Sequence, residues 1–176
     1  KKIELKLIVS GAHLSETYGY SVKDIENDGL KILAEIETLI DSNSKSARVK
    51  SASILLQNSI DIVKKFNPNL IIYAGDREDV LIASTIGGYL EIPTIHFYGG
   101  DHVQDSHIDN AVRHAVSKLS TIHMVSTKKH KDRLIKMGEI KKRIYILQSR
   151  PLLGKKKSVK NEKLHEVIIN LIKKFK

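Results

Sequence analysis

Short apolar runs alternate with longer amphipathic segments along most of this chain, and this alternation restricts the possible folds more than any other feature. The clearest runs are LIIYA at 70–74 and TIHFY at 94–98, which are apolar enough for strands covered on both faces. The segments between such runs are long enough for crossover helices, which parallel strands require. The sequence therefore predicts an α/β fold, with a parallel sheet and helices on both faces.

The same pattern predicts the remaining elements. Strands are expected at 3–9, 70–74, 94–98, 122–126 and 144–147, and helices at 44–66, 78–89, 108–119 and 128–137. The stretch 28–40 has both helical and alternating spacing, and we favour a strand. Beyond Pro151 the pattern breaks into a lysine-rich linker, residues 151–160, and a last amphipathic helix, residues 161–176, which needs a partner surface.

Composition excludes several classes of function. The chain has no cysteine, which rules out disulfides, thiolate metal sites and cysteine nucleophiles, and a cytoplasmic location is the default. No uncharged apolar run is long enough to span a bilayer. The net charge of +10 is local, because residues 1–127 hold 13 basic and 16 acidic side chains and residues 128–176 hold 17 and 4. Without interleaved aromatic residues or a known motif, this basic excess does not predict nucleic-acid binding.

Three polar loops follow predicted strands, at 11–20, 75–79 and 99–109. In an open parallel sheet such loops lie at the carboxyl ends of the strands, where ligands bind. Asp76 is the strongest single candidate for acid–base chemistry, because a carboxyl group beside an apolar strand end suits proton transfer. Its alternative role is the N-cap of the helix at 78–89. The loops also hold His13, Arg77, Asp79, Asp101, His102, Asp105, His107 and Asp109.

The histidines and glycines of this region permit further interpretations. The histidines at 96, 102, 107 and 114 lie near several aspartates, but their spacing matches no known ligand pattern, and we expect no metal site. His96 lies inside a predicted strand, where a hydrogen-bonded core histidine is expected. Gly99–Gly100 precedes a helix and is compatible with a phosphate-binding turn. No dinucleotide-binding or P-loop glycine motif occurs.

Several longer segments resemble one enzyme family. They are GAHLSETYGYSVKDIENDG at 11–29, AGDREDVLIAS at 74–84, IPTIHFYGGD at 92–101, HIDNAVRHAVSKLSTIHMVST at 107–127 and RLIKMGE at 133–139. Together they resemble the UDP-N-acetylglucosamine 2-epimerase family, in particular its hydrolysing, sialic-acid-pathway type, and the resemblance covers residues 3 to about 147. It implies the Rossmann-like N-terminal half of a GT-B fold, with the sugar nucleotide bound in the cleft between the halves.

The resemblance also implies a reaction and a set of site residues. Such an enzyme removes the C2 proton of UDP-N-acetylglucosamine, eliminates UDP to leave 2-acetamidoglucal, and adds water to release N-acetylmannosamine, and no cofactor is expected. Tyr98 stands where relatives often have glutamate, and Asp101 or Asp105 is the candidate substitute for that acid, while the Tyr98 hydroxyl is a candidate hydrogen-bond donor. The expected catalytic residues are Asp76, Asp109, Asp101 and His114, and the expected substrate-binding residues are His13, Arg77, Tyr98, Gly99, Gly100 and Arg113.

The resemblance does not extend to the family's second domain. The family's opening strand and C-terminal domain have no counterpart here, and 154–176 resembles the family's terminal helix, which packs back on the N-terminal half. We expect a fragment or shortened form with a domain at 1–150, a linker at 151–160 and a helix at 161–176, and little turnover by this chain alone. The parent protein is expected to form a dimer or tetramer. Two alternatives stay open: a UDP-N,N'-diacetylbacillosamine 2-epimerase of legionaminic acid synthesis, and a non-catalytic interaction module that retains the fold.

Overall fold

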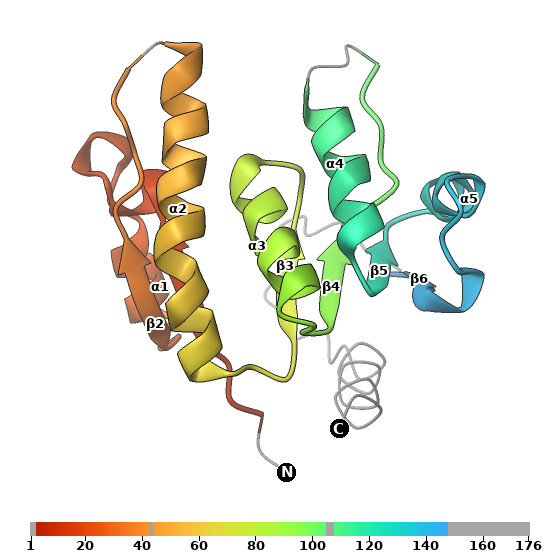
Figure 1. The fold of residues 1–176 in the computed structure, drawn as a ribbon, viewed down its shortest axis with the longest axis horizontal. Coiled ribbons are helices and arrows are strands. Elements are labelled where there is room, and N and C mark those ends of the chain that lie inside the picture. Colours follow the sequence, from red (N-terminus) through yellow and green to blue (C-terminus); the bar gives the residue numbers. More distant parts are fainter. Residues whose placement is uncertain (1–2, 43, 105–107, 148–176) are drawn as a thin grey trace, which may run out of the picture. The chain divides into compact units, whose positions relative to one another are not determined.

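Two parallel sheets, each in its own part of the chain, make up the fold (Figure 1). The computed structural model describes residues 3–42, 44–104 and 108–147. The chain divides into a first unit, Lys1–Asn67, and a second unit, Pro68–Lys176. The predicted α/β class with parallel strands is confirmed. The described strands belong to two sheets, although the strand pattern alone suggested one.

The first unit pairs β1 (Leu7–Ser10) with β2 (Ile32–Ile36) in parallel. The connection contains two 3-10 turns, η1 (Gly11–Leu14) and η2 (Glu16–Tyr18), and the helix α1 (Val22–Asn27). Sequence periodicity does not predict α1, because its six residues are too few to display a helical repeat. The strand favoured within 28–40 is confirmed as β2.

The long helix α2 (Lys45–Phe66) completes the first unit and packs against β2. It begins where predicted, because the Ser44 hydroxyl accepts the Ala47 N–H at 3.2 Å and caps the free amides of the first turn. It ends at Phe66, because the following C-cap residue, Asn67, has a φ of 50° in the left-handed region and stops the helix. Local side-chain chemistry thus sets both ends of α2.

The second unit is a four-stranded parallel sheet in the order β3-β4-β5-β6. Its elements are β3 (Ile71–Ala74), α3 (Glu78–Tyr89), β4 (Thr94–Phe97), α4 (Ile108–Leu119), β5 (Ile122–Val125), α5 (Lys128–Lys136), the 3-10 turn η3 (Lys141–Arg143) and β6 (Ile144–Ile146). Helices α3 and α4 have the bounds that the sequence predicts. They pack against each other, and α3 also packs against β3 (Figure 1).

The two faces of this sheet differ in polarity. One face buries Ile95, Ile122 and Met124 together. On the other face His96 and His123 are partners in the register of β4 and β5, and both are fully buried. Tyr73 on β3 is the register partner of His96 and extends this polar row to a third strand. Polar side chains therefore occupy the buried face that α3 and α4 cover.

Some sequence-based expectations concern residues outside the described ranges. They are the linker and helix at 151–176, and the side chains of Asp105 and His107. The domain bounds proposed for the end of the chain therefore stay a prediction. Within residues 3–42, 44–104 and 108–147, no helix combines the length and the apolar character needed to cross a membrane.

Candidate functional site

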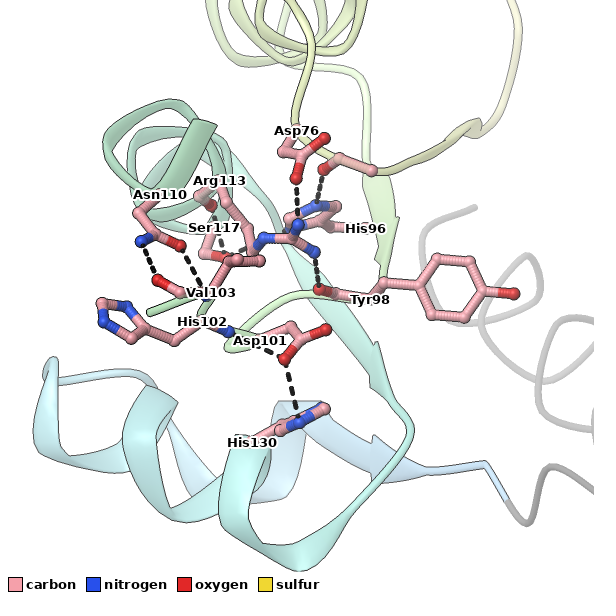
Figure 2. Close-up of polar contacts among 11 residues, drawn as sticks. Asp76, His96, Tyr98, Asp101, His102, Val103, Asn110, Arg113, Ser117 and His130 are labelled. Atoms are coloured by element: carbon pink, nitrogen blue, oxygen red, sulfur yellow. Dashed lines mark hydrogen bonds and ion pairs between the residues drawn. The ribbon is translucent and has the colours of Figure 1, made fainter. Parts of the chain in front are cut away.

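An ion pair between Asp76 and Arg113 lies at the carboxyl ends of β3 and β4 (Figure 2). Asp76 follows β3 after Gly75, and Arg113 projects from the buried face of α4. Nη2 of Arg113 pairs with Oδ2 of Asp76, while Nη1 donates to the Tyr98 carbonyl at 3.0 Å. Only 9% of the Arg113 side chain and 23% of the Asp76 side chain are exposed. One guanidinium thus joins the segments that follow two neighbouring strands.

The structure does not place Asp76 at the N-cap of α3. Arg77 occupies that position, and its side chain makes no capping hydrogen bond. Glu78 and Asp79 supply the acidic side chains of the first turn. The capping alternative for Asp76 is therefore wrong, and its carboxylate is used in the pair with Arg113. Arg77 itself is exposed.

His96 connects the Gly75 turn to α4. Its Nε2 lies 2.9 Å from the Gly75 carbonyl oxygen, and its Nδ1 lies 3.2 Å from the Ser117 hydroxyl. The side chain is 0% exposed, and this burial lowers its pKa to about 4. The ring is therefore neutral at pH 7. The predicted hydrogen-bonded core histidine is confirmed.

Tyr98 contributes its backbone to the site. Its φ of 65° is left-handed, its N–H donates to the Met124 carbonyl at 2.8 Å, and its carbonyl accepts from Arg113. The phenol ring is 49% exposed, and Figure 2 shows it pointing away from the ion pair. The Asp76–Arg113 pair therefore contacts the carbonyl of this residue, and a role for its ring in substrate binding stays a prediction.

The glycine pair after Tyr98 lets the loop approach α4 and α5 closely. A Cβ on Gly99 would lie 3.0 Å from His96 Nδ1 and 3.1 Å from the Ser117 hydroxyl oxygen. Gly100 has a φ of +72°, and a Cβ there would collide with the His130 carbonyl oxygen of α5. Arg133 donates to the Gly100 carbonyl. Packing thus accounts for both glycines, and phosphate binding by this turn stays a prediction.

Asp101 contacts α5, and His114 on α4 contacts the same loop through His102. One carboxylate oxygen of Asp101 accepts the His102 N–H at 2.8 Å and lies 3.2 Å from His130 Nε2. The rings of His102 and His114 stack with centroids 6.1 Å apart. Burial, followed by the positive charge of neighbouring groups, lowers the pKa of His114. Asp101 is therefore tied to α5, whereas Asp76 is tied to α4. Asp109 is half-buried in the first turn of α4.

The first unit holds the other candidate loop. His13 is exposed in η1, and its Nδ1 lies 2.7 Å from the Ser21 hydroxyl. An open pocket of about 350 Å³ is lined by Gly11, Leu14, Ser15, Thr17, Tyr18, Glu37, Leu39 and Asp41. Sequence reasoning did not single out Glu37 and Asp41. The available signal was their position beyond the carboxyl end of β2, which Glu37 follows directly and Asp41 follows within the next segment.

Sequence reasoning also missed two polar residues of α4. Asn110 holds the loop by accepting the Val103 N–H at 3.1 Å and donating to the Val103 carbonyl at 2.8 Å. Ser117 contacts His96, as described above. Asn110, Arg113 and Ser117 are three and four residues apart, so they lie on one helix face, and all three are buried. A row of polar residues on an otherwise apolar face of α4 was therefore the sequence signal for Asn110 and Ser117.

Among the described residues, no group of three histidine, aspartate or glutamate side chains is arranged to hold a metal ion.

Comparisons with known proteins agree on one family. A family model described as UDP-N-acetylglucosamine 2-epimerase matches residues 1–149. The chain is 33% identical over 149 residues to the GDP/UDP-N,N'-diacetylbacillosamine 2-epimerase (hydrolyzing) of Campylobacter jejuni, covering 85% of this chain and 38% of that protein. It is 30% identical over 151 residues to the UDP-N-acetylglucosamine 2-epimerase of Neisseria meningitidis, covering 84% of this chain and 38% of that protein. The chain thus spans well under half the length of these relatives.

A solved structure has the same fold. It is the UDP-N-acetylglucosamine 2-epimerase from Neisseria meningitidis bound to UDP-N-acetylglucosamine, which matches with a TM-score of 0.58 at 14% identity. The match covers 81% of this chain and 45% of that one. Similarity at this identity shows the Rossmann-like fold, while the sequence matches show the family.

Proposed function

Because this chain belongs to the UDP-N-acetylglucosamine 2-epimerase family, we propose that the whole protein is a hydrolysing 2-epimerase. It converts UDP-N-acetylglucosamine to N-acetylmannosamine and UDP through 2-acetamidoglucal. The observation that carries this proposal is the Asp76–Arg113 pair at the carboxyl end of the sheet, inside the matched residues. In this proposal the chain is the N-terminal half of a GT-B enzyme, and UDP-sugar binds between the halves.

The reaction needs proton transfer at one carbon and departure of a diphosphate from its neighbour. A base takes the C2 proton, the C2–H electrons form the C1=C2 bond, and UDP leaves with the electrons of its bond to C1. Water then adds its hydroxyl to C1, while C2 receives a proton on the opposite face. Two acid–base groups on separate segments of the chain, one after β3 and one in the first turn of α4, suit this sequence of steps. We assign these roles to Asp76 and Asp109, with Asp101 and His114 as further candidates.

Arginine and backbone groups support these steps. Arg113 is committed to Asp76 and to the Tyr98 carbonyl, so its proposed role is to orient the carboxylate. Arg77 is exposed at the start of α3, where its guanidinium and the helix N-terminus both favour an anion such as the leaving diphosphate. His13, Tyr98, Gly99 and Gly100 complete the proposed substrate-binding set.

The test is a coupled assay for UDP and N-acetylmannosamine on the whole encoded protein. Asp76→Asn preserves the size of the side chain but removes a proton acceptor, and we expect kcat to fall roughly 10²- to 10⁴-fold. Asp79→Asn is the matched control: Asp79 is exposed in the first turn of α3, and its variant should retain nearly full turnover. Wild-type protein that releases neither product, or an Asp76→Asn variant with normal kcat, contradicts the proposal.

The relative from Campylobacter jejuni favours a second candidate, hydrolysis and epimerisation of UDP-N,N'-diacetylbacillosamine. This substrate differs from UDP-N-acetylglucosamine at C4 and C6 of the sugar, so the same chemistry at C1 and C2 serves both. A panel with both UDP-sugars separates the candidates by their kcat/KM values. A preference for the diacetylated sugar would make it the proposed substrate in place of UDP-N-acetylglucosamine, and the roles proposed for Asp76 and Asp109 would be the same.

A further inference from the structure

We propose that His96 is a positioning residue that fixes the orientation of Asp76 through the Gly75 carbonyl. The inference rests on the proposed function, in which the Asp76 carboxylate takes part in proton transfer. His96 is fully buried and contacts the turn that carries Asp76 (Figure 2).

Hydrogen-bond chemistry determines which ring nitrogen carries the proton. The Gly75 carbonyl can only accept, so the 2.9 Å contact requires an N–H at Nε2 of His96. Burial keeps the ring neutral at pH 7, which leaves Nδ1 unprotonated. Nδ1 is then an acceptor 3.2 Å from the Ser117 hydroxyl, whose single proton is shared between this nitrogen and the Arg113 carbonyl oxygen. The ring therefore has one donor directed at the Gly75 turn and one acceptor directed at α4.

The bond to Gly75 acts directly on Asp76. The Gly75 carbonyl and the Asp76 N–H belong to one rigid peptide plane, so holding the oxygen fixes the direction in which the Asp76 Cα leaves the turn. Gly75 has a φ of +100°, a conformation that strand geometry does not impose. The hydrogen bond from His96 to the Gly75 carbonyl holds the turn in this conformation.

The same histidine links this turn to the helix that carries Arg113. Ser117 lies one helical turn after Arg113, and its hydroxyl is 2.9 Å from the Arg113 carbonyl oxygen. These contacts lead from Asp76 through Arg113, Ser117 and His96 to Gly75, and the single Ser117 proton makes one of its two hydrogen bonds at a time. Asp76 is thereby held twice, through its carboxylate and through its backbone.

A pair of amide variants tests this role. In His96→Gln the side-chain amide nitrogen reaches the place of Nε2 and can donate to Gly75. In His96→Asn the amide is one methylene shorter and reaches only the Ser117 side. Both variants replace the ring with a neutral amide, so they should lose similar thermal stability. Only His96→Asn should release the Asp76 turn.

Nuclear magnetic resonance of the 176-residue chain measures this difference. The wild-type ring should show a protonated Nε2, and the ¹⁵N shift of the Asp76 amide should report the hydrogen bond to the preceding carbonyl. We expect His96→Gln to keep that shift. We expect His96→Asn to move it and to speed exchange of the Arg113 guanidinium protons roughly three- to tenfold. Equal effects of both variants, or wild-type signals in His96→Asn, would overturn the proposal.

Kinetics of the whole protein provide the second measurement. His96→Asn should lower kcat by up to about 10²-fold with little change in KM, because misorientation of a reacting group affects the chemical step. His96→Gln should recover most of this loss. The resonance measurement needs no substrate, so a whole protein without epimerase activity would refute the proposed function while leaving the structural role of His96 separately testable.

Discussion

At the scale of single residues, the site depends on polar side chains that are removed from water and paired with one another. Asp76 and Arg113 were both named from the sequence, the former because it follows an apolar strand. Ser117 and Asn110 were not, because serine and asparagine in a helix ordinarily face solvent. Their importance follows from burial beside the His96 ring and the Val103 backbone.

Acidification should destabilise the fold through His96. Burial lowers its pKa from 6.5 to about 4, so between these values the unfolded chain binds a proton that the folded chain does not. Stability is therefore highest above about pH 6.5 and falls as the pH drops toward 4, by an amount on the order of 3 kcal/mol for this residue. Urea unfolding at a series of pH values measures this loss.

His96→Gln is the control, because glutamine does not titrate. Its free energy of unfolding should depend less on pH in the same range. Some dependence should persist, since burial also lowers the pKa of His123. A wild-type free energy that is unchanged between pH 7 and pH 4.5 would refute the expectation.

At the scale of elements, local patterns specified most helices and strands. Helices α3 and α4 begin and end at the predicted residues, and the Ser44 cap marks the start of α2. These signals come from neighbours a few residues apart, which is why they can be recognised without a structure. Close packing between elements cannot be recognised from residues a few positions apart, and the glycines show this most clearly.

Two glycines in the second unit should respond to alanine in opposite ways. Gly100 is left-handed, and its Cβ would meet the His130 carbonyl oxygen, so Gly100→Ala should destabilise by about 1–3 kcal/mol. Gly88 lies in α3 with only Leu119 Cδ2 at 4.0 Å, so Gly88→Ala should stabilise by about 0.5–1 kcal/mol. Thermal unfolding of both variants measures the two effects. Equal effects would mean that packing of the loop against α5 has no energetic role.

At the scale of the whole molecule, the chain matches only part of the length of its relatives. It spans 38% of the length of its relatives from Campylobacter jejuni and Neisseria meningitidis. The second unit contains the ion pair, and the first unit contains the pocket with Glu37 and Asp41. Formation of a dimer or tetramer stays a prediction.

The isolated chain should therefore turn over UDP-N-acetylglucosamine poorly. An enzyme that binds its substrate between two halves loses both affinity and orientation when one half supplies only some of the contacts. The measurement is UDP release by the 176-residue chain beside the whole encoded protein at equal concentration. Turnover by the isolated chain at the rate of the whole protein would show that these residues suffice for catalysis.

The sequence by itself determined most element types and bounds, the α/β class and the family, because periodicity, caps and motifs depend on residues close together in the chain. Only the tertiary structure decided the connections at the site. Asp76 pairs with a residue 37 positions away, Asp101 is bound to α5, and the Tyr98 ring points outward. Such contacts depend on how helices pack on a sheet, and that packing is set by many side chains acting together.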